Sequence, residues 1–211
     1  MSPIRLFSGI IGSMIVLPSA YAAVVYDESS LGDLSNDRAH PTLVSLGTGS
    51  NIVTGTVGII GGTKDLDYFV VTVGKGQSLN ALTVLQGTAS SGSVSFIGVQ
   101  SGATMTLDPD AKPFPDPKIL LGWKHYSKHD IGQDILPKMG DAAATGSQGF
   151  AAPLGPGAYT FWIQETSTGP VDYRFDFVTT AVSAVPEPTS SALFLAGLCA
   201  LGLQMRQRRK A

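Results

Sequence analysis

The sequence predicts an all-β fold for residues 23–184, of the β-sandwich or jelly-roll kind. Residues 171–177 alternate without interruption between apolar and charged side chains, which is the pattern of a strand with one buried and one solvated face. Short segments rich in Val, Thr and Ile recur at intervals of about ten residues, separated by Gly or Ser clusters. Residues 23–184 contain no long segment with helical periodicity, so a helical fold is not expected.

Eight segments have the composition of strands. They are residues 42–46, 51–57, 68–73, 78–85, 94–100, 104–107, 158–164 and 171–177. In the last segment, Tyr173, Phe175 and Phe177 are expected on the buried face, because side chains alternate across a strand. Ser, Thr, Gly and Pro at 167–170 predict a hairpin turn between the last two segments.

Residues 108–149 interrupt this pattern as an irregular insertion. The proline-rich stretch 109–117 disfavours strand pairing and favours an extended, stiff chain. Trp123 and Tyr126 follow closely, and an insertion of this length in a small domain is often functional. The flat rings of Trp123 and Tyr126 are candidates for contact with a sugar ring. The alternative is a packed flap whose aromatic side chains fill a gap in the core.

Residues 1–22 have the three-part pattern of a secretory signal peptide. Arg5 provides a positive start, residues 6–17 are apolar, and Ala-Tyr-Ala at 20–22 is a small-x-small cleavage site. We therefore expect signal peptidase and the secretion machinery as partners, and a mature chain that begins near Ala23. A buried N-terminal helix or strand is the alternative.

Residues 185–211 contain a second three-part pattern. Val-Pro-Glu-Pro at 185–188 is followed by an uncharged apolar stretch at 189–205 and a basic cluster at 206–210. The cluster contains Arg206, Arg208, Arg209 and Lys210. A helix over 189–205 would span roughly 25 Å, which predicts a single, marginal transmembrane helix. The basic cluster should stay cytoplasmic and leave residues 23–185 outside.

Pro186, Glu187 and Pro188, with the apolar stretch and basic cluster after them, resemble the PEP-CTERM sorting tail. The resemblance implies that a membrane-embedded exosortase recognises the chain, holds it briefly in the inner membrane of a Gram-negative bacterium and cuts it near Glu187. The protein is then released, or attached at the cell surface or in the extracellular matrix. Because the family is associated with bacteria that produce exopolysaccharide, the resemblance also implies exopolysaccharide as a partner. An ordinary tail anchor after a chance Pro-Glu-Pro is the alternative.

Two segments of the predicted core resemble a second protein family. Asp65 and Asp67, followed by a hydrophobic strand and Gly74, are similar to a signature of bacterial pre-peptidase C-terminal domains, and residues 154–161 are similar to their late Leu…Gly-x-Tyr strand. Those domains are jelly-roll sandwiches that accompany secreted enzymes and sometimes bind calcium or polysaccharide. Residues 108–149 depart from their compact pattern.

The sequence requires no cofactor, but it contains candidate ligands for calcium. Asp65 and Asp67 project to the same side of an extended chain, and calcium prefers several such oxygens. Asp33 also lies in an earlier loop rich in Asp and Asn, although these residues are common turn formers. The single cysteine, Cys199, lies within 189–205, so the exported part has no disulfide and depends on its core or a metal for stability.

The sequence predicts no catalytic residue. The G-x-S-x-G, G-x-x-x-x-G-K-[ST] and H-E-x-x-H motifs are absent. Nine of the 14 basic residues and 15 of the 16 acidic residues lie in residues 23–184, and the net charge of −6 disfavours nucleic acid as a partner. We expect a non-catalytic exported protein of the cell surface or extracellular matrix, associated with exopolysaccharide. The alternative is a secreted hydrolase that uses scattered carboxylates to cut polysaccharide.

Overall fold

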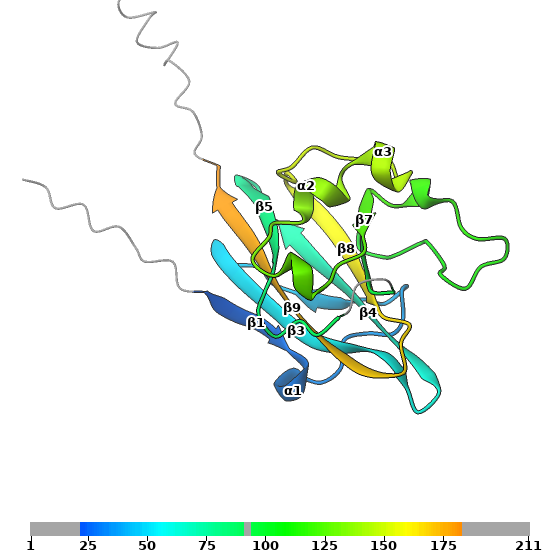
Figure 1. Ribbon diagram of the computed structural model, residues 1–211. Coiled ribbons are helices and arrows are strands. Elements are labelled where there is room, and N and C mark those ends of the chain that lie inside the picture. The colour runs from blue at the N-terminus through cyan, green and yellow to red at the C-terminus, as the bar shows by residue number, and fades with distance from the viewer. Residues whose placement is uncertain (1–21, 91–93, 183–211) are drawn as a thin grey trace, which may run out of the picture.

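The computed structural model of the chain describes residues 22–90 and 94–182 (Figure 1). The predicted sorting tail at 185–211 lies outside these residues, and so does the predicted signal peptide except for Ala22. In the two described ranges, no helix is long and apolar enough to cross a membrane.

The described elements are mostly strands. In chain order they are β1 (Ala23–Asp27), α1 (Glu28–Leu31), β2 (Thr42–Val44), β3 (Gly49–Ile60), β4 (Thr63–Val73), β5 (Gln77–Val84), β6 (Phe96–Ser101), η1 (Pro117–Ile119), β7 (Gly122–Lys124), η2 (Lys128–Asp130), α2 (Leu136–Met139), α3 (Ala142–Thr145), β8 (Gly157–Gln164) and β9 (Gly169–Ala181). Each of these helices has only three or four residues. The predicted all-β class is therefore confirmed.

The strands form one sheet that curls over on itself. Its order is β5-β9-β3-β4-β8-β6-β7, with β1 beside β3 and β2 beside β4. β3 and β4 pair only near their shared turn, where residues 58–60 face residues 63–65. Beyond this short hairpin β3 runs against β9, while β4 runs against β8. We call β1, β3, β5 and β9 the first layer, and β2, β4, β6, β7 and β8 the second layer.

The hydrophobic core lies between the two layers. Phe177 of the first layer packs edge-on against Phe161 and Phe69 of the second, with ring centroids 5.0 and 5.7 Å apart. Tyr173, Phe175 and Phe177 are fully buried, whereas the charged residues between them are partly exposed. The predicted alternation along residues 171–177 is confirmed, and it builds a sandwich-like core from a single curled sheet.

Two expectations about individual elements were wrong. Residues 104–107 form no strand, because Met105 N–H bonds to Arg38 O and Thr106 N–H bonds to the side chain of Gln100. Residues 167–170 do not turn β8 back onto β9: β8 pairs with β4 and β6, whereas β9 pairs with β3 and β5. This segment instead carries the chain from the second layer to the first.

Much of the predicted insertion, residues 108–149, is packed into the domain. β7 pairs with β6 at one edge of the sheet, and residues 131 and 134 form bridges with β5 at the other edge. Four side chains of the segment are fully buried in the main core: Tyr126, Ile135, Leu136 and Met139. Residues 108–116 contain no regular element, as their prolines predict. The later part of the insertion thus links the two edges of the curled sheet.

Candidate functional site

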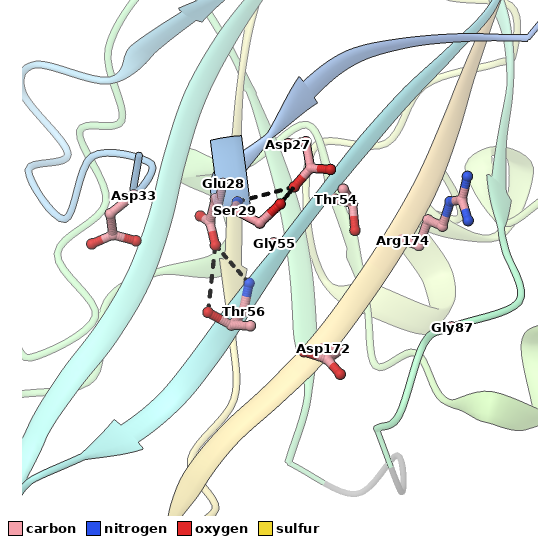
Figure 2. Close-up of a pocket in the computed structure, with 10 residues that line it drawn as sticks. All are labelled: Asp27, Glu28, Ser29, Asp33, Thr54, Gly55, Thr56, Gly87, Asp172 and Arg174. Carbon is pink, nitrogen blue, oxygen red and sulfur yellow. Dashed lines mark hydrogen bonds between the residues drawn. The ribbon is translucent and has the colours of Figure 1, made fainter. Parts of the chain in front are cut away.

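A polar hollow of about 500 Å³ opens over β3, with α1 on one side and β9 on the other (Figure 2). Its lining consists of Asp27, Glu28, Ser29, Asp33, Thr54, Gly55, Thr56, Gly87, Asp172 and Arg174. Four of these side chains are acidic and one is basic, so the hollow favours a cation over an anion.

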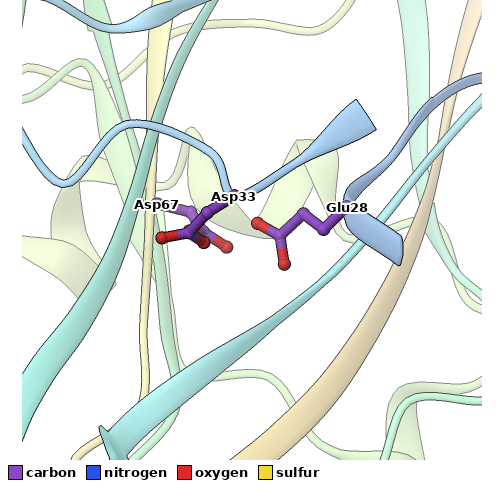
Figure 3. A group of neighbouring side chains, drawn as sticks. All are labelled: Glu28, Asp33 and Asp67. Atoms are coloured by element: carbon purple, nitrogen blue, oxygen red, sulfur yellow. The ribbon is translucent and has the colours of Figure 1, made fainter. Parts of the chain in front are cut away.

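Three carboxylates converge beside this hollow (Figure 3). Glu28 comes from α1, Asp33 from the loop after it, and Asp67 from β4. Each offers an oxygen atom that lies within 4.8 Å of the others. We call these three residues the carboxylate cluster. In residues 22–90 and 94–182, none of the three forms an ion pair with Lys, Arg or His.

Backbone groups hold the carboxylate of Glu28 in place. Its Oε2 accepts a hydrogen bond from Thr56 N–H at 2.7 Å, and its Oε1 accepts one from Leu34 N–H at 3.1 Å. The carboxylate lies over Gly55 of β3, where an added Cβ would be 2.6 Å from Glu28 Cδ and from Tyr173 Oη. A glycine at this position therefore leaves the space that the carboxylate occupies.

Asp67 is the buried member of the cluster, with 0% of its surface exposed. The hydroxyl of Tyr173 donates a hydrogen bond to Asp67 Oδ2 at 2.6 Å. Asp67 Oδ1 has no hydrogen-bond partner among the described residues. Burial, and then the charge of Glu28, raise the pKa of Asp67 to about 9. Burial also raises the pKa of Glu28.

Of the two aspartates that the sequence suggested as calcium ligands, Asp67 belongs to the carboxylate cluster and Asp65 does not. Asp65 lies outside the carboxylate cluster, and its Oδ1 accepts a hydrogen bond from Asn36 Nδ2 at 3.4 Å. Asp67 instead meets Asp33, which the sequence placed in an Asp- and Asn-rich loop, and Glu28, which it did not single out. No local pattern could have identified Glu28, because its neighbours in the cluster are brought to it by the fold.

A second, apolar hollow of about 260 Å³ lies beside β7. It is lined by Phe96, Leu107, Pro109, Phe114, Pro115, Pro117, Leu120, Trp123, Thr145 and Trp162, and we call it the aromatic hollow. Trp123 is partly exposed, its ring is stacked 5.6 Å from that of Phe96, and its indole N–H donates to Thr145 O at 2.8 Å. The sequence-based candidate Trp123 thus borders an open cavity.

Tyr126 does not line the aromatic hollow, and the prediction that it contacts a sugar ring is corrected by the structure. Its side chain is fully buried and packs edge-on against Phe175 at 4.9 Å. The physical reason is that the chain turns into the core after β7, so the packed-flap alternative holds for this residue.

The residues of the predicted sorting tail lie outside the described part of the chain. They are Pro186, Glu187, Pro188, Arg206, Arg208, Arg209 and Lys210.

Comparison with known proteins identifies the tail. The family model of the PEP-CTERM protein-sorting motif matches residues 184–210, which span the motif, the apolar stretch and the basic cluster. No curated protein and no solved structure has a significant match to the chain. The resemblance drawn from Pro186, Glu187 and Pro188 is confirmed, and the pre-peptidase resemblance of the core stays a prediction. The chain therefore carries a PEP-CTERM sorting tail, which marks it as an exported protein that an exosortase processes and sorts to the cell surface.

Proposed function

We propose that the folded domain is a non-catalytic module of the cell surface or extracellular matrix that binds exopolysaccharide through the aromatic hollow. The observation that carries this proposal is the ring of Phe114, which is 81% exposed at the rim of the hollow. An exposed large aromatic side chain beside an apolar cavity is typical of a binding surface.

The surroundings of Phe114 favour binding. Pro113 and Pro115 flank it and restrict the backbone, so little conformational entropy is lost when a ligand covers the ring. The ammonium group of Lys112 lies 4.7 Å from the ring centroid and also supplies hydrogen-bond donors. A sugar chain has apolar C–H faces for such rings and hydroxyl groups for such donors.

Trp162 contributes only a small part of this lining. It is 5% exposed, and its ring centroid lies 4.5 Å from that of Phe96. Thr145 is the polar residue among the otherwise apolar and aromatic walls. Apolar walls with few polar groups are the usual composition of a small-ligand site.

The carboxylate cluster gives little support to the alternative of a polysaccharide hydrolase. Such an enzyme needs two carboxyl groups that reach the substrate. Asp67 is fully buried, and both oxygens of Glu28 already accept backbone hydrogen bonds. Of the three, only Asp33 is exposed. Proteins with the sorting tail are, moreover, generally exosortase substrates rather than enzymes.

Co-sedimentation of the full chain with exopolysaccharide from the producing strain tests the proposal. We expect saturable retention that weakens roughly tenfold in Phe114→Ala, because this substitution removes an aromatic anchor. Leu43→Ala is the matched control, since Leu43 is 67% exposed on β2 and does not line the hollow. Equal retention of both variants would contradict the assigned surface. Release of reducing sugar during the assay would favour the hydrolase.

A further inference from the structure

We propose that the carboxylate cluster of Glu28, Asp33 and Asp67 binds one calcium ion, which fastens the segment from β1 to Asp33 onto the sheet. The site is separate from the aromatic hollow, so the proposal does not depend on the binding of exopolysaccharide.

The first support is the unpartnered oxygen of Asp67. Its side chain is fully buried, and its Oδ1 accepts no hydrogen bond from the described residues. The carboxylate of Asp67 lies together with those of Glu28 and Asp33. A buried acceptor without a partner, placed next to two other acids, is costly unless a proton or a cation joins them. The polar hollow is lined by the other two members of the cluster, Glu28 and Asp33, so a cation can approach the cluster from that side (Figure 2).

The second support is that the fold holds these carboxylates in position while leaving them able to coordinate. Each oxygen of Glu28 is held by a backbone N–H group, and Asp67 Oδ2 is held by the hydroxyl of Tyr173. A carboxylate oxygen has two lone pairs, so each held oxygen retains one for a metal. Gly55 provides the space for Glu28, because a side chain there would collide with its carboxylate.

The donor set selects the kind of cation. All three side chains offer carboxylate oxygens, which are the ligands of hard cations, whereas zinc sites usually contain His or Cys. Calcium accepts six to eight oxygens in flexible geometry, so water from the polar hollow can complete its shell. Magnesium requires a nearly ideal octahedron and releases its water reluctantly. Export by the sorting route also brings the chain to compartments where weak calcium sites, with Kd on the order of 0.1–1 mM, are useful.

The placement of the three ligands gives the ion a structural role. Glu28 and Asp33 belong to the segment after β1, Asp67 belongs to the second layer, and its partner Tyr173 belongs to the first. An ion among them would join three parts of the domain near the point where β3 and β4 diverge. It would replace the covalent stabilisation that a domain without cysteine lacks.

Calorimetric titration of the full chain tests the site. The chain is purified in mild detergent, freed of metal with EDTA, and titrated with CaCl₂ and separately with MgCl₂. We expect one saturable calcium site, at least about tenfold weaker binding of magnesium, and a higher midpoint of thermal unfolding in calcium than in EDTA. Equal affinities for the two metals would overturn the calcium assignment.

Two variants distinguish calcium binding at the carboxylate cluster from non-specific attraction of cations to the acidic hollow. Asp33→Asn should weaken calcium binding at least about tenfold and still fold, because Asp33 is exposed. Asp172→Asn is the matched control, with the same loss of charge in the polar hollow but outside the cluster. If both variants bind as the parent chain does, the cluster is not the site. If the parent chain binds no calcium and Asp67→Asn is more stable, the cluster shares a proton instead.

Discussion

Tyr173 of β9 donates a hydrogen bond to Asp67 of β4 at 2.6 Å, which joins the two layers of the curled sheet through a fully buried pair of side chains. Asp67 is also a member of the carboxylate cluster, and the hydrogen bond fixes one of its two oxygens. The same two residues therefore serve both the packing of the layers and the geometry of the candidate cation site.

Tyr173→Phe should destabilise the domain, whereas Tyr126→Phe should not. The first change leaves Asp67 Oδ2 without its donor, at a cost of about 1–3 kcal/mol in the free energy of unfolding. The second removes a buried hydroxyl that has no partner among the described residues, so its effect should be within about 0.5 kcal/mol or stabilising. Urea unfolding in EDTA measures both. A larger loss for Tyr126→Phe would refute this assignment of partners.

Gly55→Ala should reduce both stability and calcium affinity. The added Cβ would lie 2.6 Å from Glu28 Cδ and from Tyr173 Oη, so the carboxylate must move, at a cost of about 1–3 kcal/mol. Gly155→Ala is the control, because nothing lies within 4 Å of a Cβ at that position. Thermal unfolding with and without calcium compares the two variants, and an unchanged calcium response in Gly55→Ala would show that Glu28 needs no such space.

The domain should lose stability steeply above pH 10, in part through Tyr126. Burial, and then the charge of Glu165, raise the pKa of Tyr126 well above its usual value of 10.0. Above pH 10 the unfolded chain loses this proton while the folded chain keeps it, so unfolding is favoured as the pH rises. The slope is at most about 1.4 kcal/mol per pH unit for one tyrosine. Urea unfolding in EDTA from pH 9 to 12 should therefore give a shallower decline for Tyr126→Phe, and parallel declines would contradict the raised pKa.

Glu187→Ala should block release of the chain by the exosortase. Glu187 lies in the matched sorting motif, and the resemblance to the family places the cut near this residue. In a host that contains an exosortase, the parent chain should leave the membrane fraction, while the variant should stay there. Asp172→Asn, outside the motif, is the control. Release of both chains would contradict a role for Glu187 in recognition.

Local sequence patterns predicted the strands better than their partners. The alternation at 171–177 identifies the buried face of β9, because it depends only on the two-residue period of a strand. The turn residues at 167–170 mark a change of direction, but they carry no information about which strands lie side by side. The pairing of β8 with β4 and of β9 with β3 is set by packing between distant segments, which a single sequence does not reveal.

The candidate sites, too, are predictable from the sequence only where their residues are close together in the chain. The sequence alone suggests Asp33 and Asp67 as candidate ligands for a cation. Their proximity to Glu28 depends on how the segment after β1 packs against β4. Trp123 and Tyr126 are three residues apart and looked equivalent, yet Trp123 lines the aromatic hollow and Tyr126 does not, because the chain enters the core between them. The sorting tail was fully predictable, since its three parts are contiguous in sequence.

Tryptophan fluorescence during titration with the strain's exopolysaccharide tests the central claim most directly. Both tryptophans of the chain, Trp123 and Trp162, line the aromatic hollow, so a ligand there must change their emission. We predict a saturable change in the full chain that is roughly tenfold weaker in Phe114→Ala, which retains both tryptophans. Emission that stays constant at saturating exopolysaccharide would contradict binding at this surface.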